Sequence, residues 1–241
     1  QTCALPISVG RTITRLSLQS KIVLTMTLFL LTLGTVGFYL LEHHNPATMG
    51  TLNAAGKFQA AFFQSVTTRT AGFASISQSG LTNGSKLLAS MLMIIGGSPA
   101  GTAGGIKTTT VAVLLLTAIS VLRGNKDTEC YGRKITFEII RVGITITLVT
   151  FVFWLFGVTV MTVIEPQQKV LDLMFEATSA MATVGLTADL TPVLSDISHV
   201  VLMLMMYIGR IGPMTMALIF SGHADKKNQF RTLPEAKIMV G

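Results

Sequence analysis

The chain has 241 residues, half of them apolar, and only 12% of them carry a charge, against about 25% in soluble domains. Its formal net charge is +7, and it holds two cysteines. This composition argues against a soluble fold, and two cysteines cannot supply a disulfide framework or a metal site.

The first eight residues fit none of the patterns that follow. The chain begins with Gln rather than Met. We interpret residues 1–8 as a non-native scar ahead of a truncated reading frame. The predictions below therefore concern residues 9–241.

Four long apolar stretches follow along the chain: residues 22–41, 87–122, 139–164 and 197–220. A helix needs about 20 apolar residues to cross the hydrocarbon core of a bilayer. Three stretches meet that length outright. The second does so only if its glycine-rich middle lies within the membrane. We therefore expect a multi-pass protein of the cell membrane.

The basic residues are distributed unevenly between the connections. Twelve Lys and Arg residues lie before the first stretch, between the second and third, and after the fourth, whereas the other connections hold three. Cytoplasmic segments carry such an excess, so both termini are predicted to be cytoplasmic. The positive charge thus reports topology, and nucleic-acid binding is not expected.

The chain divides near Asn125 into two halves, residues 9–124 and 125–241, with one plan. In each half a span is followed by a short helix, a polar turn and a second span. The short helices, about 54–68 and 169–182, are too short to cross a bilayer of about 30 Å. We expect them to enter from outside and return as extended chain. The predicted fold is an all-α membrane protein with two helix–pore-loop–helix repeats.

Each short helix ends in a similar tetrapeptide, and the two copies are 113 residues apart. Extended backbone at membrane depth must be buried in protein or line a watery cavity. Rings of its carbonyl oxygens can replace the hydration shell of a potassium ion. The alternative is an ordinary turn in an interfacial loop. The predicted ion-binding filter comprises Thr70, Ala71, Gly72, Phe73, Thr183, Val184, Gly185 and Leu186.

The segment 96–107 interrupts the second apolar stretch. Its glycines and its proline cannot continue a stable helix, so the long span should break at membrane depth. The alternative is a loop between two short interfacial helices. A phosphate-binding loop is excluded because Ile106 stands where that motif needs glycine before Lys107. The predicted gate residues here are Gly96, Gly97, Ser98, Pro99, Gly101, Gly104, Gly105 and Lys107.

Arg210 lies inside the fourth apolar stretch, where a charge costs roughly 3 kcal/mol. We therefore expect it to face the protein interior and meet a partner, and we count it among the gate residues. Arg69, directly before the first tetrapeptide, is expected to brace the pore helix. Glu176 of the second short helix is its candidate partner.

Four motifs together resemble the Trk/Ktr/HKT superfamily, and most of all the bacterial Ktr membrane subunit. They are residues 63–73, 96–108, 175–179 with 183–186, and 209–213, and the resemblance covers about residues 15–241. Members of that superfamily have four helix–pore-loop–helix repeats around one ion path. Residues 9–124 and 125–241 match the third and fourth of these, and the first two repeats are missing.

The resemblance implies a potassium uptake protein rather than an enzyme, with potassium as its substrate and no cofactor. It also implies that segment 96–107 is an intramembrane gate below the filter, with Arg210 against it. The implied partners are membrane lipid, a second copy of the full-length subunit, and a cytoplasmic nucleotide-binding regulatory ring. The alternative is a secondary cation carrier coupled to sodium or protons, because such carriers also use broken helices.

Overall fold

The computed structural model describes residues 17–99, 103–125 and 127–212. Seven α-helices, one 3-10 turn (Thr191–Val193) and a two-stranded hairpin account for its regular structure within these ranges. The helices are α1 (Leu18–Glu42), α2 (Ala54–Thr67), α3 (Asn83–Ile94), α4 (Thr108–Leu122), α5 (Phe137–Ile164), α6 (Val170–Met181) and α7 (Asp196–Ile211).

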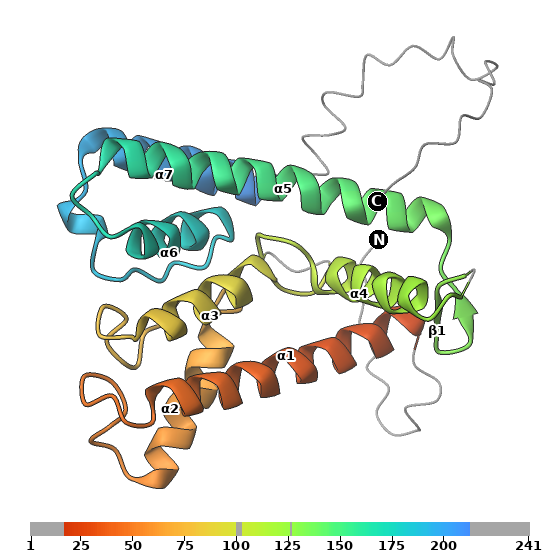
Figure 1. Cartoon of the computed structure of the whole chain (residues 1–241), viewed down its shortest axis with the longest axis horizontal. Helices are drawn as coiled ribbons and strands as arrows, with labels where there is room; N and C mark the ends of the chain where they lie inside the picture. Colours follow the sequence, from red (N-terminus) through yellow and green to blue (C-terminus); the bar gives the residue numbers. More distant parts are fainter. Residues whose placement is uncertain (1–16, 100–102, 126, 213–241) are drawn as a thin grey trace.

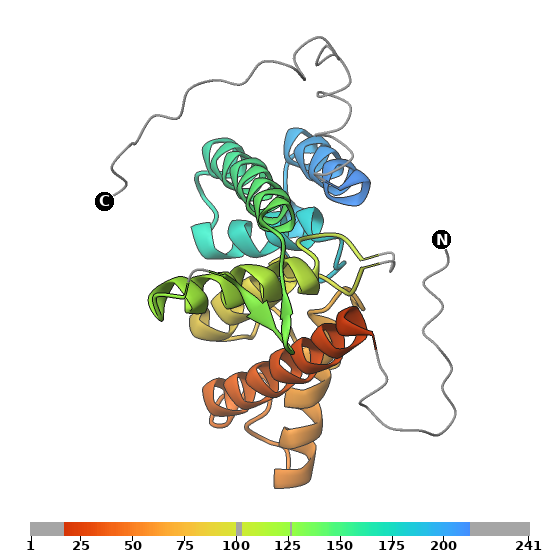
Figure 2. The same cartoon turned by 90° about the vertical axis from the view of Figure 1, so that its right-hand side faces the viewer.

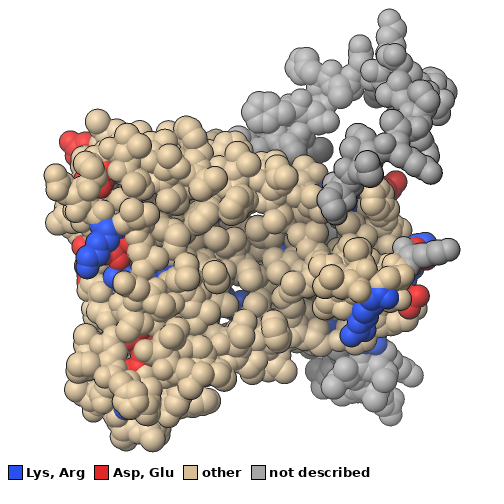
Figure 3. All heavy atoms as spheres, viewed as in Figure 1, with Lys and Arg blue, Asp and Glu red and all other residues tan. Residues whose placement is uncertain are grey.

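The helices lie in layers that share one long axis. Figure 1 shows α1 along one side, α3 and α4 in the middle, and α5 with α7 along the other side. The short helices α2 and α6 both lie at the end opposite the hairpin. Figure 2 shows the same layers end on, with α5 and α7 side by side. On the face that Figure 3 draws, charged side chains gather at the two ends, and the belt between them is almost entirely uncharged.

α1 and α5 are the two described helices long and apolar enough to span a membrane. Both leave large apolar side chains on the surface, among them Leu28 (66% exposed) and Leu148 (60% exposed). In water such exposure would be costly, whereas lipid accepts it. These two helices are therefore the candidate membrane spans of their halves.

The expected second span is interrupted between α3 and α4. The chain leaves the helical conformation at Ile95 and resumes it at Thr108. A single parallel bridge closes the base of the intervening segment: the Gly96 amide donates to the Ile106 carbonyl and the Ile106 amide to the Ile94 carbonyl, both at 2.9 Å. The fourth expected span begins as α7, and its residues beyond 212 lie outside the described part of the chain.

The internal repeat extends to the helix caps. The Thr82 hydroxyl caps α3 by accepting from the Ser85 amide, and the Ser195 hydroxyl caps α7 by accepting from the Ser198 amide. Ser195 lies 113 positions after Thr82, and Ser198 lies 113 positions after Ser85, the same offset that separates the two tetrapeptides. A carboxylate at the end of the outer helix binds each capping residue: Glu42 accepts from the Thr82 amide and Glu165 from the Ser195 amide.

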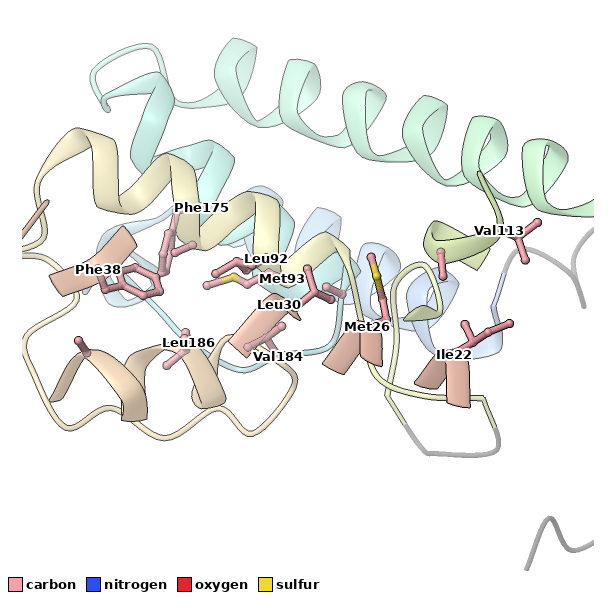
Figure 4. Close-up of a cluster of buried hydrophobic side chains, with 14 of the residues drawn as sticks. Ile22, Met26, Leu30, Phe38, Leu92, Met93, Val113, Phe175, Val184 and Leu186 are labelled. Atoms are coloured by element: carbon pink, nitrogen blue, oxygen red, sulfur yellow. The ribbon is translucent and has the colours of Figure 1, made fainter. Parts of the chain in front are cut away.

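The larger core lies between α1, α3 and α6. Figure 4 shows Leu30 and Phe38 of α1 facing Leu92 and Met93 of α3, with Phe175 of α6 beside them. Val184 and Leu186, which follow α6, point into the same cluster. The core of the first half is thus completed by side chains of the second half, so the two repeats pack as one unit.

The connection 123–136 contains a hairpin that the sequence analysis did not predict. β1 (Glu129–Cys130) pairs antiparallel with β2 (Arg133–Lys134), and the turn between them is Tyr131-Gly132 with positive φ at both residues (49° and 72°). Two left-handed residues are typical of a tight hairpin turn. Two-residue strands leave no alternating apolar pattern by which to predict them.

Candidate functional site

The two tetrapeptides share one backbone conformation. Thr70 and Thr183 have positive φ (66° and 54°), and so do Gly72 and Gly185 (77° and 93°). Positive φ is uncommon for threonine, so each threonine is held there by its surroundings. Residues of positive φ therefore alternate with ordinary ones in both copies.

The two tetrapeptides lie directly against each other. A Cβ atom added to Gly72 would collide with the carbonyl oxygen of Val184. A Cβ atom added to Gly185 would stand 3.9 Å from the Cα atom of Gly72. The structure thus brings together the two segments that the sequence analysis singled out as a filter, although 113 residues separate them.

Each strand is fixed to its own pore helix. The Val184 amide donates to the Ser179 carbonyl (2.9 Å), and the Thr67 hydroxyl donates to the Phe73 carbonyl (2.5 Å). The side chain of Leu186 is buried, whereas that of Phe73 is 71% exposed. Because it accepts from Thr67, the Phe73 carbonyl faces α2. The two copies therefore differ at their outer ends.

The chain that returns from each filter strand is tied to the pore helix by side chains. In the first repeat Gln64 and Gln78, both buried, exchange two amide hydrogen bonds (2.6 and 3.1 Å). In the second, Glu176 accepts from the Thr187 hydroxyl (2.5 Å) and the Ala188 amide (2.9 Å). These buried bonds hold the returning chain against the pore helix and so stabilise the strand between them.

The predicted pairing of Arg69 with Glu176 is wrong. The Arg69 guanidinium instead reaches the Thr27 carbonyl of α1 at 3.5 Å. The carboxylate of Glu176 is occupied by its own return segment. Arg69 therefore connects the end of α2 to the outer helix of its own repeat.

A second contact joins outer helix to pore helix at equivalent places in the two repeats. The Ser65 hydroxyl of α2 donates to the Leu31 carbonyl of α1 (3.0 Å). In the second repeat the Trp154 indole N–H of α5 donates to the Thr178 hydroxyl of α6 (2.8 Å). Trp154 was not among the predicted site residues. The repeat offset could have indicated this contact, because Thr178 lies 113 residues after Ser65.

The glycine-rich segment reaches from the first repeat to the filter strand of the second. The Gly104 amide donates to the Thr183 hydroxyl at 3.0 Å. A Cβ atom on Gly104 would stand 2.5 Å from that hydroxyl oxygen and 2.8 Å from the Ala182 carbonyl oxygen. Only glycine allows this approach. The backbone of the segment therefore lies against the end of α6.

The other predicted gate residues of this segment lie at its base and flank. Gly96 and Gly105 lie at the closing bridge, and a Cβ atom on Gly96 would collide with the Gly104 carbonyl. The Gly97 carbonyl accepts from the Thr108 amide (3.2 Å), and the Lys107 ammonium donates to the Ala103 carbonyl (2.5 Å). Ser98 and Pro99 are half-buried on the outgoing arm. Gly101 lies outside the described residues.

Arg210 had been expected to face the protein interior. In the described part of the chain its side chain is instead exposed. It lines a cavity of about 820 Å³ together with Thr183, Gly185 and Tyr207. It lies near enough to Lys107 for the two positive charges to act on each other. Arg210 is thus placed on the same side of the filter strand as the glycine-rich segment.

α7 is held close to the end of α6. A Cβ atom on Gly209 would collide with the carbonyl oxygen of Met181. This approach fixes the neighbouring Arg210 relative to the strand that begins at Thr183. Among the described residues no group of three or more His, Cys, Asp or Glu side chains could hold a metal ion.

Comparison with known proteins gives one family. A family model described as TrkH, cation transport protein, matches residues 9–231. The Ktr system potassium uptake protein B of Bacillus subtilis is 37% identical over 225 residues, 93% of this chain and 50% of that protein. Its namesake in Vibrio alginolyticus is 39% identical over 226 residues, 94% and 49% of the two chains.

A third relative is the potassium/sodium uptake protein NtpJ of Enterococcus hirae, 34% identical over 230 residues, 94% of this chain and 51% of that protein. The chain therefore spans about half the length of these curated relatives.

The crystal structure of the potassium transporter TrkH from Vibrio parahaemolyticus superposes with a TM-score of 0.67 at 17% identity. The match covers 81% of this chain and 43% of that one. At this identity the likeness speaks for the fold alone. It confirms the predicted fold class, an all-α membrane protein with helix–pore-loop–helix repeats.

Proposed function

The chain belongs to the TrkH family of cation transport proteins, and on this premise we propose that the complete protein takes up potassium ions across the cell membrane. The two tetrapeptides supply half of a selectivity filter made of backbone carbonyls. Potassium is the substrate, and the chemistry is the exchange of water for carbonyl oxygens rather than a covalent reaction.

One observation carries this proposal. Positive φ recurs at Thr70 and Gly72, and again at Thr183 and Gly185, in two strands that touch. Two separate interfacial turns would have no reason to share a strained conformation and to lie against each other. Two strands that present carbonyl oxygens to one path would need both features.

The segment 96–107 is the proposed gate. Two observations support this role: the Gly104 amide donates to the Thr183 hydroxyl, and Lys107 and Arg210 lie near enough for their positive charges to interact. A cation leaving the filter would meet both the segment and this charge. Closely packed glycines allow the segment to change its backbone torsions at little cost.

The proposed assembly follows the family. The complete subunit forms a homodimer in membrane lipid and is regulated by a cytoplasmic nucleotide-binding ring. Both termini are cytoplasmic in this proposal, because the connection 123–136 carries basic residues such as Arg123 and Arg133. The hairpin β1–β2 then lies on the surface available to the ring.

Rubidium uptake by potassium-starved cells that express the full-length gene tests the function. Gly185→Asp should abolish uptake at normal expression, because a carboxylate side chain would enter the ion path. Unchanged uptake with an unchanged potassium/sodium preference would refute the filter. Deleting residues 99–104 should raise flux, and equal or lower flux in folded protein would refute the gate.

A sodium- or proton-coupled carrier is the second candidate. The name of the Enterococcus hirae relative includes sodium as well as potassium. Rubidium uptake that requires sodium, or a proton gradient, on the same side of the membrane would favour the carrier. Uptake that follows the rubidium gradient alone would favour a channel.

A further inference from the structure

An apolar cavity that the proposed filter and gate do not account for lies between the two repeats. The cavity has a volume of about 530 Å³ and lies between α4, α5, the end of α6 and the base of the segment 96–107. Figure 1 shows that segment lying opposite the middle of α5. The volume falls within the range of about 300–1,000 Å³ of sites that hold small ligands.

The internal repeat explains why this space is open. In the first repeat Arg69 extends from the end of α2 to the Thr27 carbonyl of α1. The position equivalent to Arg69, 113 residues later, is Ala182, and the α5 position equivalent to Thr27 is Thr150. Both Ala182 and Thr150 line the cavity. The second repeat therefore lacks the long side chain that bridges the same two helices in the first.

The α5 register used here rests on two further equivalences. Trp154 of α5 contacts the pore helix of its repeat, as Leu31 of α1 does in the first repeat. A Cβ atom added to Gly157 would meet Met205 of α7, and one added to Gly34 would meet Leu92 of α3. Each α5 residue lies 123 positions after its α1 counterpart, as Thr150 lies after Thr27.

The wall of the cavity is unsuited to water. The hydroxyls of Thr147, Thr150 and Thr178 already donate to backbone carbonyls of their own helices at 2.6–2.9 Å. The Trp154 indole N–H donates to Thr178. A buried water needs two to four polar partners, and an apolar cavity otherwise stays dry. The occupant should therefore be apolar.

The cavity opens to the lipid-facing surface at the depth of acyl chains. Its α5 residues run from Ile144 to Trp154 in a helix of 28 residues, about 10–25 Å along a length of about 40 Å. Ile144, Leu148 and Phe151 line it and are at least half exposed, at 50%, 60% and 54%. Lipid chains reach this depth, whereas headgroups and soluble molecules do not.

We propose that this cavity holds one acyl chain of a membrane lipid, which takes the place in the second repeat that Arg69 takes in the first. The chain would contact Ala182, directly before the second filter strand, and Gly105 with Ile106 at the base of the segment 96–107. Within lipid, the gain is the contact that fills an otherwise empty space.

Photolabelling of the full-length protein tests this site. The protein is placed in nanodiscs of phosphatidylethanolamine and phosphatidylglycerol that include phosphatidylglycerol with a diazirine midway along one acyl chain. After irradiation, adducts are expected on the peptides of residues 144–154 and of Ile106 or Ala182. Phosphatidylglycerol with the diazirine in its headgroup should leave these peptides unlabelled.

Two variants fill the cavity from different helices. Ala182→Phe extends from α6 and Thr147→Phe from α5, so that a folding defect in one leaves the other to decide. Both should lose the adducts on Ile106 and its neighbours. The matched control, Val152→Phe, adds the same ring at an α5 position that is 55% exposed and does not line the cavity, and it should keep them.

The proposal would be overturned if the wild-type protein formed no adduct. It would also be overturned if both filled variants formed as much adduct as the wild type. Adducts replaced by cross-links to a second copy of the chain would also overturn it, because a protein segment would then fill the space. The labelling does not depend on which ion is carried. A protein that transports no potassium could still hold the lipid, and a potassium transporter could leave the cavity without lipid. Failure of one proposal is therefore distinguishable from failure of the other.

Discussion

The backbone amide of Gly104 donates a hydrogen bond to the side-chain hydroxyl of Thr183, at 3.0 Å. The donor belongs to the segment between α3 and α4 of the first repeat, and the acceptor is the first residue of the second proposed filter strand. The segment and the strand are therefore coupled by a direct bond. A change in one has a physical route to the other.

We predict that Gly104→Ala weakens closure by the segment 96–107. The new Cβ atom would stand 2.5 Å from the Thr183 hydroxyl oxygen, so the segment must withdraw and its hydrogen bond is lost. An unpaired buried amide costs about 1–3 kcal/mol, which corresponds to roughly 5–150-fold in the ratio of open to closed states. Rubidium flux should rise by several-fold.

Gly143→Ala is the matched control for that substitution. It adds the same methyl group in α5, where the nearest atoms stand at 3.5–3.9 Å, an ordinary contact distance. Its flux should equal that of the wild type. Equal flux in Gly104→Ala, at equal amounts of folded protein, would show that the Gly104 contact does not restrain conduction.

The two filter glycines should respond differently to alanine. Both have positive φ, which costs a residue with a Cβ atom about 1–2 kcal/mol. The Cβ atom of Gly72→Ala would in addition collide with the Val184 carbonyl, whereas that of Gly185→Ala would have 3.9 Å to its nearest neighbour. Potassium-over-sodium selectivity, measured by competition for rubidium uptake, should fall further in Gly72→Ala. An equal or opposite order would contradict the packing of the two strands.

The sequence could predict those parts of the site that are local in the chain. The apolar stretches, the short helices and the break at segment 96–107 follow from hydropathy length and glycine content. The repeat offset pointed to two equivalent strands. Partners distant in the chain could not be read this way. The Arg69 contact with Thr27 and the Trp154 contact with Thr178 depend on helix packing, to which several side chains fit equally well.

The contact of Trp154 with Thr178 should position the second pore helix. Trp154→Phe keeps an aromatic ring and removes the indole N–H, so that a hydrogen bond worth about 1 kcal/mol is lost. The Tm in detergent should fall by about 2–4 °C, and selectivity should decline, because α6 carries the filter strand. Thr178→Ser keeps the acceptor and should preserve selectivity. Loss in both variants would point to packing rather than to this bond.

A salt bridge joins the two repeats near their outer ends. The Lys86 ammonium of α3 lies 2.6 Å from the Asp172 carboxylate of α6, with side chains 8% and 21% exposed. Lys86→Met leaves that carboxylate without its cation and should destabilise the protein by about 1–3 kcal/mol, the cost of a buried polar group left unsatisfied. The double variant Lys86→Met with Asp172→Leu should cost less than the two single changes added together. Additive losses of Tm would show that the pair does not couple the repeats.

Glu165 should make stability depend on pH at the outer end of α5. The Ser195 hydroxyl, the Ser195 amide and the Ser198 hydroxyl, in that order, hold the pKa of Glu165 below its ordinary value, because they bind its charged form. A carboxyl whose pKa is lower in the folded state stabilises the fold above its unfolded pKa, about 4.3. That stabilisation is lost as the pH falls through the lower, folded pKa.

Glu165→Gln should therefore lower the Tm at pH 7, and the difference from the wild type should shrink as the pH falls below about 5. The amide can still accept one hydrogen bond from the Ser195 amide but gains nothing from ionisation. The Tm difference between the two proteins, measured from pH 7 down to about pH 2 so that the range passes through the lowered pKa of Glu165, isolates this residue from the other carboxylates. A difference that stays constant over that range would show that the charge of Glu165 does not hold Ser195 and α7 in place.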